Sequence, residues 1–146
     1  MIPAIRQAQT PAGRALEMIR SVLLLLSLAG WLVYPVELVL LKHWLKTWHS
    51  KVPFVLSPPA AILTAWVLFL DRGTPWARRA FIVVMWAAIL MGLAGAYFHL
   101  GWNFEGKVNW GFATTMKAAA GERPVLAPLA FVHLGVTGLL AIYRAR

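Results

Sequence analysis

Two histidines and one glutamate are the side chains of this sequence that could do chemistry inside a membrane. Glu37 interrupts the first long apolar run, His99 comes near the end of the third, and His133 lies about eight residues into the fourth. At 1.5 Å of rise per residue, His133 would lie about 12 Å below the start of its helix. Ionisable residues at such depths are costly and are functional-site candidates by default. We therefore expect a proton or cation path, a cofactor ligand, or a hydrogen bond to another helix at these positions.

The two histidines raise the question of a tetrapyrrole cofactor. A bis-histidine haem needs two imidazoles at similar depth on facing helices. His99 ends its run, whereas His133 lies about 12 Å inside its own, so the pair fits poorly. A single imidazole with a water could still ligate haem or a bacteriochlorophyll-type magnesium. The sequence leaves a haem, bacteriochlorophyll or quinone at His99 and His133 open, beside an ordinary structural hydrogen bond.

A second polar group follows the third apolar run. His99, Asn103 and Glu105 occupy positions i, i+4 and i+6, where a helix would leave the bilayer. These side chains could tie down the following loop by hydrogen bonds, or they could bind a quinone headgroup at the interface. A zinc site built from His43, His49, His99 and Glu105 would need the outer loops to converge, and it lacks the compact ligand spacing of known zinc motifs. We therefore expect no metal site.

Composition places the chain in lipid. Hydrophobic residues make up 60% and charged residues 13% of the 146 positions, against roughly 45–50% and about 25% in soluble domains. The absence of cysteine excludes disulfides, thiolate nucleophiles and iron–sulfur clusters. No catalytic set stands out, so an enzyme is not expected. The net charge of +9 sits beside the apolar runs, where it suits anionic membrane lipids as partners rather than nucleic acid.

The apolar runs define the expected architecture. Each is close to the roughly 20 residues that a helix needs to cross a bilayer, and none alternates as a barrel strand would. We predict an all-α bundle of four transmembrane helices forming one domain over residues 1–146. The expected spans are 22–41, 54–70, 80–100 and 125–143. Ser57-Pro58-Pro59 and Pro128 are expected in the first turns of the second and fourth spans.

Basic residues predict the orientation. With both termini in the cytoplasm of a bacterium, eight Lys and Arg residues fall on the inside and six on the outside of the inner membrane. The outer side then carries the long loop 101–124 between the third and fourth spans. Tryptophans gather on that side too: Trp44, Trp48, Trp102 and Trp110. The loop could hold a lid, an amphipathic helix around 114–120, or a docking surface.

Small and polar residues recur at helical spacing in three of the spans. Small side chains on one face let helices approach closely in lipid. The stripes are Ser27, Gly30, Tyr34 and Glu37 in the first span, Ala88, Gly92 and Ala96 in the third, and Ala130, His133, Thr137 and Ala141 in the fourth. We expect each stripe to face a neighbouring helix.

The second half of the chain resembles a group of small bacterial four-helix membrane proteins without an established activity. The resemblance rests on a His-x-x-x-Asn-x-Glu element, His99 to Glu105, and a Pro-x-Leu-Ala-Pro element, Pro124 to Pro128. It departs from that pattern in Gly106-Lys107, where an acidic residue is usual, and in the lack of a glycine after Pro128. The resemblance implies the four-helix architecture and makes His99, Asn103 and Glu105 one unit.

Two functions are consistent with these patterns. The first is a non-catalytic accessory or assembly subunit that binds other integral membrane subunits of a bacterial respiratory or photosynthetic complex. The small size, the packing stripes and the missing catalytic set favour it. The second is a small redox or transport protein that uses His99, His133 and Glu37 around a cofactor or an ion path. The sequence does not identify the partner complex.

Overall fold

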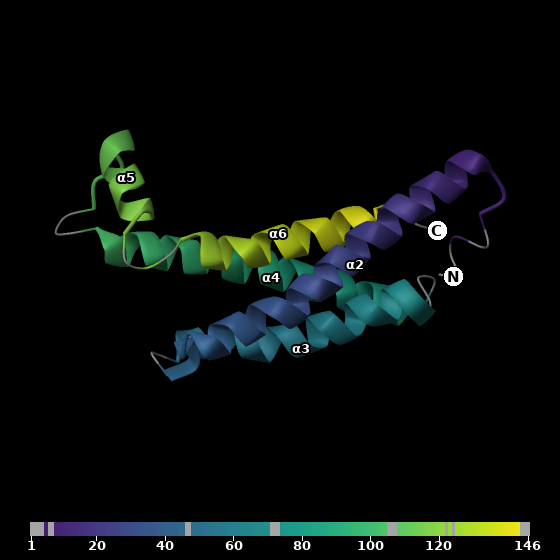
Figure 1. The fold of residues 1–146 in the computed structure, drawn as a ribbon, viewed down its shortest axis with the longest axis horizontal. Coiled ribbons are helices and arrows are strands. Elements are labelled where there is room, and N and C mark those ends of the chain that lie inside the picture. The colour runs from purple at the N-terminus through teal and green to yellow at the C-terminus, as the bar shows by residue number, and fades with distance from the viewer. Residues whose placement is uncertain are drawn as a thin grey trace.

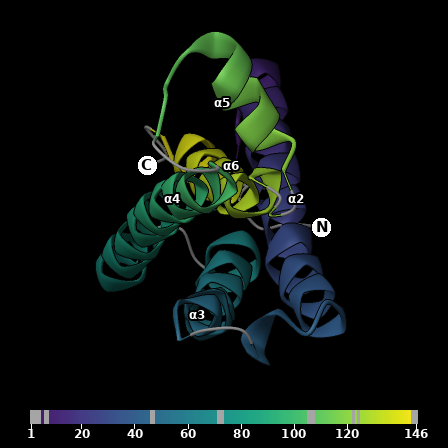
Figure 2. The same cartoon turned by 90° about the vertical axis from the view of Figure 1, so that its left-hand side faces the viewer.

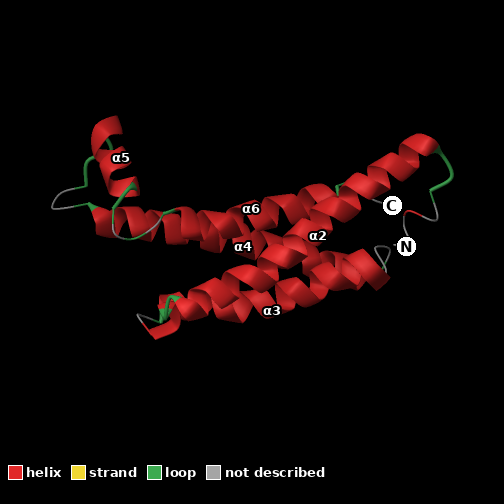
Figure 3. Cartoon of the chain, viewed as in Figure 1, coloured by secondary structure: helices red, strands yellow, loops and turns green. Residues whose placement is uncertain are grey.

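The protein is an all-helical bundle (Figure 1). The computed structural model describes residues 5, 8–45, 48–70, 74–104, 108–121, 123 and 125–143, and these residues contain helices and turns but no strand (Figure 3). The α-helices are α2 (Pro11–Leu40), α3 (Val52–Ala65), α4 (Pro75–Asn103), α5 (Phe112–Ala119) and α6 (Leu126–Ala141). Short 3₁₀ turns at His43–Leu45 and His49–Lys51 precede α3, and a π-helical turn, Trp66–Leu70, follows it. The predicted all-α class is confirmed.

Three segments have the length and composition to cross a membrane. They are Pro11–Leu40, His49–Leu70 and Pro75–Asn103, with mean hydropathies of 2.0, 1.8 and 2.1. At 30 and 29 residues, α2 and α4 measure about 44 Å, more than the roughly 30 Å of a hydrocarbon core. The apolar helix α6 has 16 residues and measures about 24 Å. Its role as a fourth span stays a prediction.

The first helix begins earlier than its apolar run. Thr10 caps α2 by accepting a hydrogen bond from the Gly13 N–H at 3.1 Å, and Pro11 takes the first helical position. Both residue types are strongly favoured at these positions. As a result Arg14 and Arg20, expected to flank the span, lie inside the helix.

The paired prolines of the second span do not start its helix, contrary to the sequence prediction. α3 begins at Val52 with Pro53 in its first turn, and Pro58 and Pro59 lie inside the helix. The 3₁₀ turn ending at Lys51 leads directly into α3, so the helix begins earlier in the sequence than the predicted residue 54. Ser57 Oγ donates to the Pro53 carbonyl at 2.7 Å, the kind of local bond that helps a membrane helix tolerate proline.

The closest helix pair is α4 with α6. A Cβ atom on Gly92 would lie 2.7 Å from the Pro128 carbonyl oxygen, and one on Gly135 would lie 2.6 Å from that of Met85. Because real Cβ contacts are longer, both glycines are needed for the backbones to approach. Ala88 and Ala96 are buried with Gly92. The small-residue stripe of α4 is therefore a packing surface, and its partner is α6 of the same chain.

α2 packs against α6 through larger side chains, and α3 lies against α2 and α4 (Figure 2). The Leu134 side chain covers Gly30. The buried Trp31 ring lies 5.8 Å from the Phe131 ring, and the Tyr34 ring lies 6.3 Å from it. Ser27, Gly30 and Tyr34 of the stripe predicted on the first span thus face α6, as expected, whereas Glu37 is exposed.

Two arginines hold the end of α6. Arg20 Nη2 of α2 donates to the Tyr143 carbonyl at 2.7 Å, and Arg78 Nη2 of α4 donates to the Ile142 carbonyl at 3.5 Å. Arg20 also forms an ion pair with Glu17 at 2.5 Å. The last carbonyls of a helix lack partners within the helix and carry partial negative charge. Both arginines supply the missing donors, and they bring the start of α2 and the end of α6 to one end of the bundle (Figure 1).

Candidate functional site

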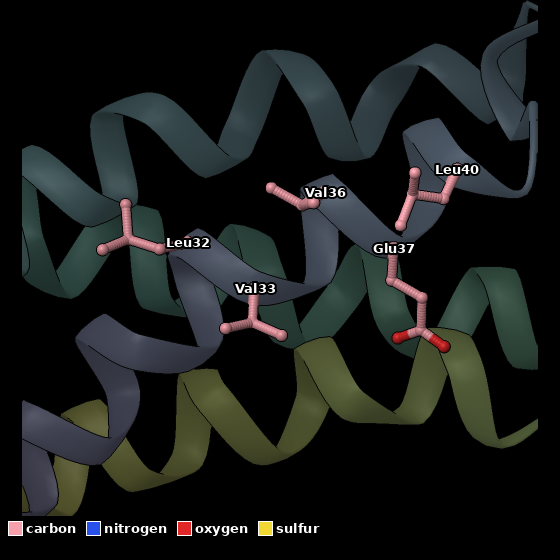
Figure 4. A pocket seen from close by; sticks show the side chains of 5 residues that line it. All are labelled: Leu32, Val33, Val36, Glu37 and Leu40. Carbon is pink, nitrogen blue, oxygen red and sulfur yellow. The ribbon is translucent and has the colours of Figure 1, made fainter.

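Glu37 lies on the outer surface of α2, one turn before the end of the helix. Its side chain is exposed, and its carboxylate has no hydrogen bond or ion pair with the described residues. Apolar side chains of the same helix surround it in a shallow depression (Figure 4); they are Leu32, Val33, Val36 and Leu40. One helix alone forms this depression, so it is a feature of the surface and not an enclosed site. Glu37 is an ionisable group on the face that would meet lipid.

His133 also faces outward. It is exposed on α6, and no described residue forms a hydrogen bond with its imidazole, whereas Thr137 and Ala141 are buried. The predicted stripe Ala130–His133–Thr137–Ala141 is therefore wrong as a single packing face. Each four-residue step along a helix advances about 40° beyond a full turn, so His133 and Ala141 differ by about 80°. The residues of α6 that are buried in the bundle are Phe131, Leu134, Gly135, Thr137, Gly138 and Ala141.

The structure does not bring Glu37, His99 and His133 together. Gly30 lies against Leu134 and Tyr34 lies near Phe131, so α2 and α6 run antiparallel. His133 is therefore level with about Trp31 of α2, and Glu37 lies about 9 Å nearer to the C-terminal end of that helix. An ion path or a shared cofactor through all three side chains has no geometric support in the described residues.

His99 lies beside His43, which the sequence connects to it only through the rejected zinc site. The His99 ring is 6.4 Å from the ring of His43 and 6.0 Å from that of Trp102. His49 lies against Phe98, at 5.8 Å between ring centroids. In the described part of the chain, no three His, Asp or Glu side chains are grouped so that they could hold a metal ion. His43 and His99 are 56 positions apart in the sequence, so their contact depends on the tertiary arrangement that brings the turn His43–Leu45 beside the end of α4.

Asn103 ties down the loop after α4. Its Nδ2 donates to the carbonyls of Ala118 at 2.9 Å and Arg123 at 2.7 Å, and its Oδ1 accepts from the Arg123 N–H at 3.2 Å. Both amide protons are used within the chain, which leaves neither to bind a quinone headgroup. Of the predicted polar cluster, Asn103 is the residue that fixes the following loop by hydrogen bonds. Glu105 lies outside the described residues.

No protein-family model matches this chain, and no curated protein or solved structure matches it significantly. The resemblance to small four-helix membrane proteins stays a prediction. Of its two elements, the structure describes His99 and Asn103 in the first and Val125 to Pro128 in the second, with Pro128 in the first turn of α6. Function must therefore be argued from the placement of the residues themselves.

The Glu17–Arg20 ion pair was not predicted from the sequence. Arg20 is 9% exposed, and the two side chains join the start of α2 to the end of α6. Their i, i+3 spacing favours an ion pair on any helix. This spacing was overlooked because the first helix was expected to begin at residue 22, after both side chains.

Proposed function

We propose that this chain is a non-catalytic subunit that binds a larger integral membrane protein of the bacterial inner membrane through the outer surface of α2 and α6. The observation that carries the proposal is the outward placement of Glu37 and His133, neither of which has a partner among the described residues. A charged side chain costs about 2.5–3.5 kcal/mol at the centre of a membrane helix on insertion scales, and Glu37, one turn from the end of α2, carries a smaller part of that cost. A neighbouring protein that bonds to these groups would offset that cost.

The proposal includes four membrane-crossing helices with both termini in the cytoplasm. α6 is apolar along its length and packs against α4 from Pro128 to Gly138, which supports its membrane position. Its 16 residues cover about 24 Å, so the bilayer would have to thin slightly around it or the helix would extend through its flanking turns. In this arrangement the loop 101–124 lies on the non-cytoplasmic side.

A different protein suits the α2–α6 surface better than a second copy of this chain. In a symmetric pair within one membrane, equivalent residues lie at equal depth, so Glu37 would face Glu37 or its apolar neighbours. Neither arrangement neutralises the carboxylate. We propose a transmembrane helix with a lysine, arginine or other hydrogen-bond donor at the depth of Glu37. Respiratory and photosynthetic complexes, the classes predicted from the sequence, are the first partners to test.

Native purification from membranes tests this function. We expect a larger membrane protein to co-purify with the tagged chain. In a Glu37→Gln, His133→Leu variant, the amount of this partner should fall roughly tenfold, because interhelical polar contacts average about 0.6 kcal/mol and reach about 1.7 kcal/mol each. Val83→Ala with Leu90→Ala is the matched control, since both residues are exposed on α4. A wild-type chain without a partner, or equal loss in both variants, would contradict the proposal.

A cofactor function has one observation in its favour. A histidine that is exposed to lipid and has no partner in the described chain could ligate the metal of a haem or bacteriochlorophyll at the bundle surface. In that case the gently solubilised protein would show a Soret or bacteriochlorophyll band. The band would vanish in His133→Leu and persist in Glu37→Gln. A colourless wild-type protein would eliminate this function.

A further inference from the structure

The short helix α5 does not run with the others. It lies across the end of the bundle where α4 finishes and α6 begins (Figures 1 and 2). Ala118 on one side of α5 is buried, and its carbonyl accepts a hydrogen bond from Asn103. One side of the helix is thus fixed to the bundle. A helix that crosses the end of a transmembrane bundle lies along the plane of the membrane surface.

Large apolar side chains of this segment, which we define as residues 108–120, are exposed. Phe112 is 82%, Trp110 57% and Met116 49% exposed. Phe112 and Met116 are four residues apart and so share a face of α5. Thr114, two positions from Phe112, lies on the opposite side and bonds to the Asn109 and Gly111 carbonyls. The helix therefore has an apolar and a polar side, and nothing in the described chain covers the apolar one.

Aromatic contacts give the depth of the segment. The Trp110 ring stacks on Tyr97 of α4, with ring centroids 6.4 Å apart and planes 20° apart. Tyr97 lies six residues before the end of α4, or about 9 Å along the helix axis. Since α4 exceeds the hydrocarbon core by about 14 Å in total, each end projects by about 7 Å if the helix is centred. Trp110 then lies at the boundary between acyl chains and headgroups.

Cationic side chains lie beside the aromatic ones. Lys117 is exposed on α5, and the guanidinium carbon of Arg123 lies 4.7 Å from the centroid of the Trp102 ring. Tryptophan with lysine and arginine is typical of segments at a membrane interface, where the rings enter the headgroup layer and the cations meet phosphates.

We propose that the segment 108–120 is an amphipathic foot that lies in the lipid leaflet at this end of the bundle. Trp110, Phe112 and Met116 enter the boundary of the acyl chains, and Thr114 faces water. The occupant of the apolar side is lipid because that surface continues into Tyr97, an exposed residue of a membrane-crossing helix. The foot fixes the depth and tilt of α4 and α6 in the membrane, whatever protein binds the α2–α6 surface.

Site-directed spin labelling tests the foot directly, since the chain contains no cysteine. Phe112→Cys and the matched control Thr114→Cys are labelled in the full-length protein, reconstituted in vesicles of phosphatidylethanolamine and phosphatidylglycerol. We expect the label at 112 to be several-fold more accessible to oxygen than to a water-soluble nickel chelate. The label at 114 should show the reverse order.

Two outcomes would overturn the foot. A label at 112 that prefers the nickel chelate would place the helix in water. A label at 112 shielded from both reagents would show that protein, not lipid, covers it. Met116→Cys probes the same face if Phe112→Cys does not fold. None of these labels tests the α2–α6 surface, so failure of the foot leaves the proposed function standing.

Discussion

Gly92→Ala should destabilise the bundle more than any other single added methyl group on α4. The new Cβ would lie 2.7 Å from the Pro128 carbonyl oxygen and 2.9 Å from the Val132 backbone nitrogen. These are backbone atoms of α6, so no side-chain rotation can relieve the overlap and the helices must separate. Overpacking of this kind costs about 1–3 kcal/mol. The measurement is the free energy of unfolding in mild detergent, with helix content followed by circular dichroism.

Gly101→Ala is the matched control. Gly101 lies in the same helix, and a Cβ atom there would have no other atom within 4 Å. Because alanine favours helix by about 1 kcal/mol over glycine, this variant should be as stable as the wild type or slightly more so. Equal destabilisation by both variants would show that α4 and α6 do not touch at Gly92.

The contrast between α4 and α6 shows what the sequence could predict. Alanine and glycine at four-residue spacing in α4 predict close helix packing. In the structure these residues do pack closely against α6. α6 is apolar on almost every side, so its pattern does not indicate which face packs. For that reason the predicted stripe with His133 was wrong, and His133 turned out to face outward.

The candidate site likewise contains features that the sequence could predict and features that it could not. The position of Asn103 at the end of α4 predicted a tie to the following loop as one of two roles, but its partners Ala118 and Arg123, 15 and 20 residues further on, could not be predicted. The neighbourhood of His99 and His43 depends on where the turn His43–Leu45 lies relative to the end of α4 and could not be predicted from spacing. The outward positions of Glu37 and His133 likewise follow from the rotation of each helix, which neighbouring side chains determine.

Arg20→Gln should have the largest effect at the other end of the bundle. Arg20 bonds to Glu17 and to the Tyr143 carbonyl, and the two side chains are only 11% and 17% exposed. Glutamine would remove the cation that pairs with the largely buried Glu17 carboxylate. Breaking one partner of such a pair costs about 3 kcal/mol. The unfolding measurement used for Gly92 checks it, with Arg14→Gln as control, because Arg14 is exposed on the same helix.

A double variant separates the two contributions of Arg20. If the broken Glu17–Arg20 ion pair causes most of the loss, Glu17→Gln with Arg20→Gln should recover a large part of the stability, since neutral amides can still share a hydrogen bond. If the bond to the Tyr143 carbonyl dominates, the double variant should be as unstable as Arg20→Gln alone. In that case the main role of Arg20 would be to hold the end of α6 against α2. A loss no larger than that of Arg14→Gln would contradict both explanations.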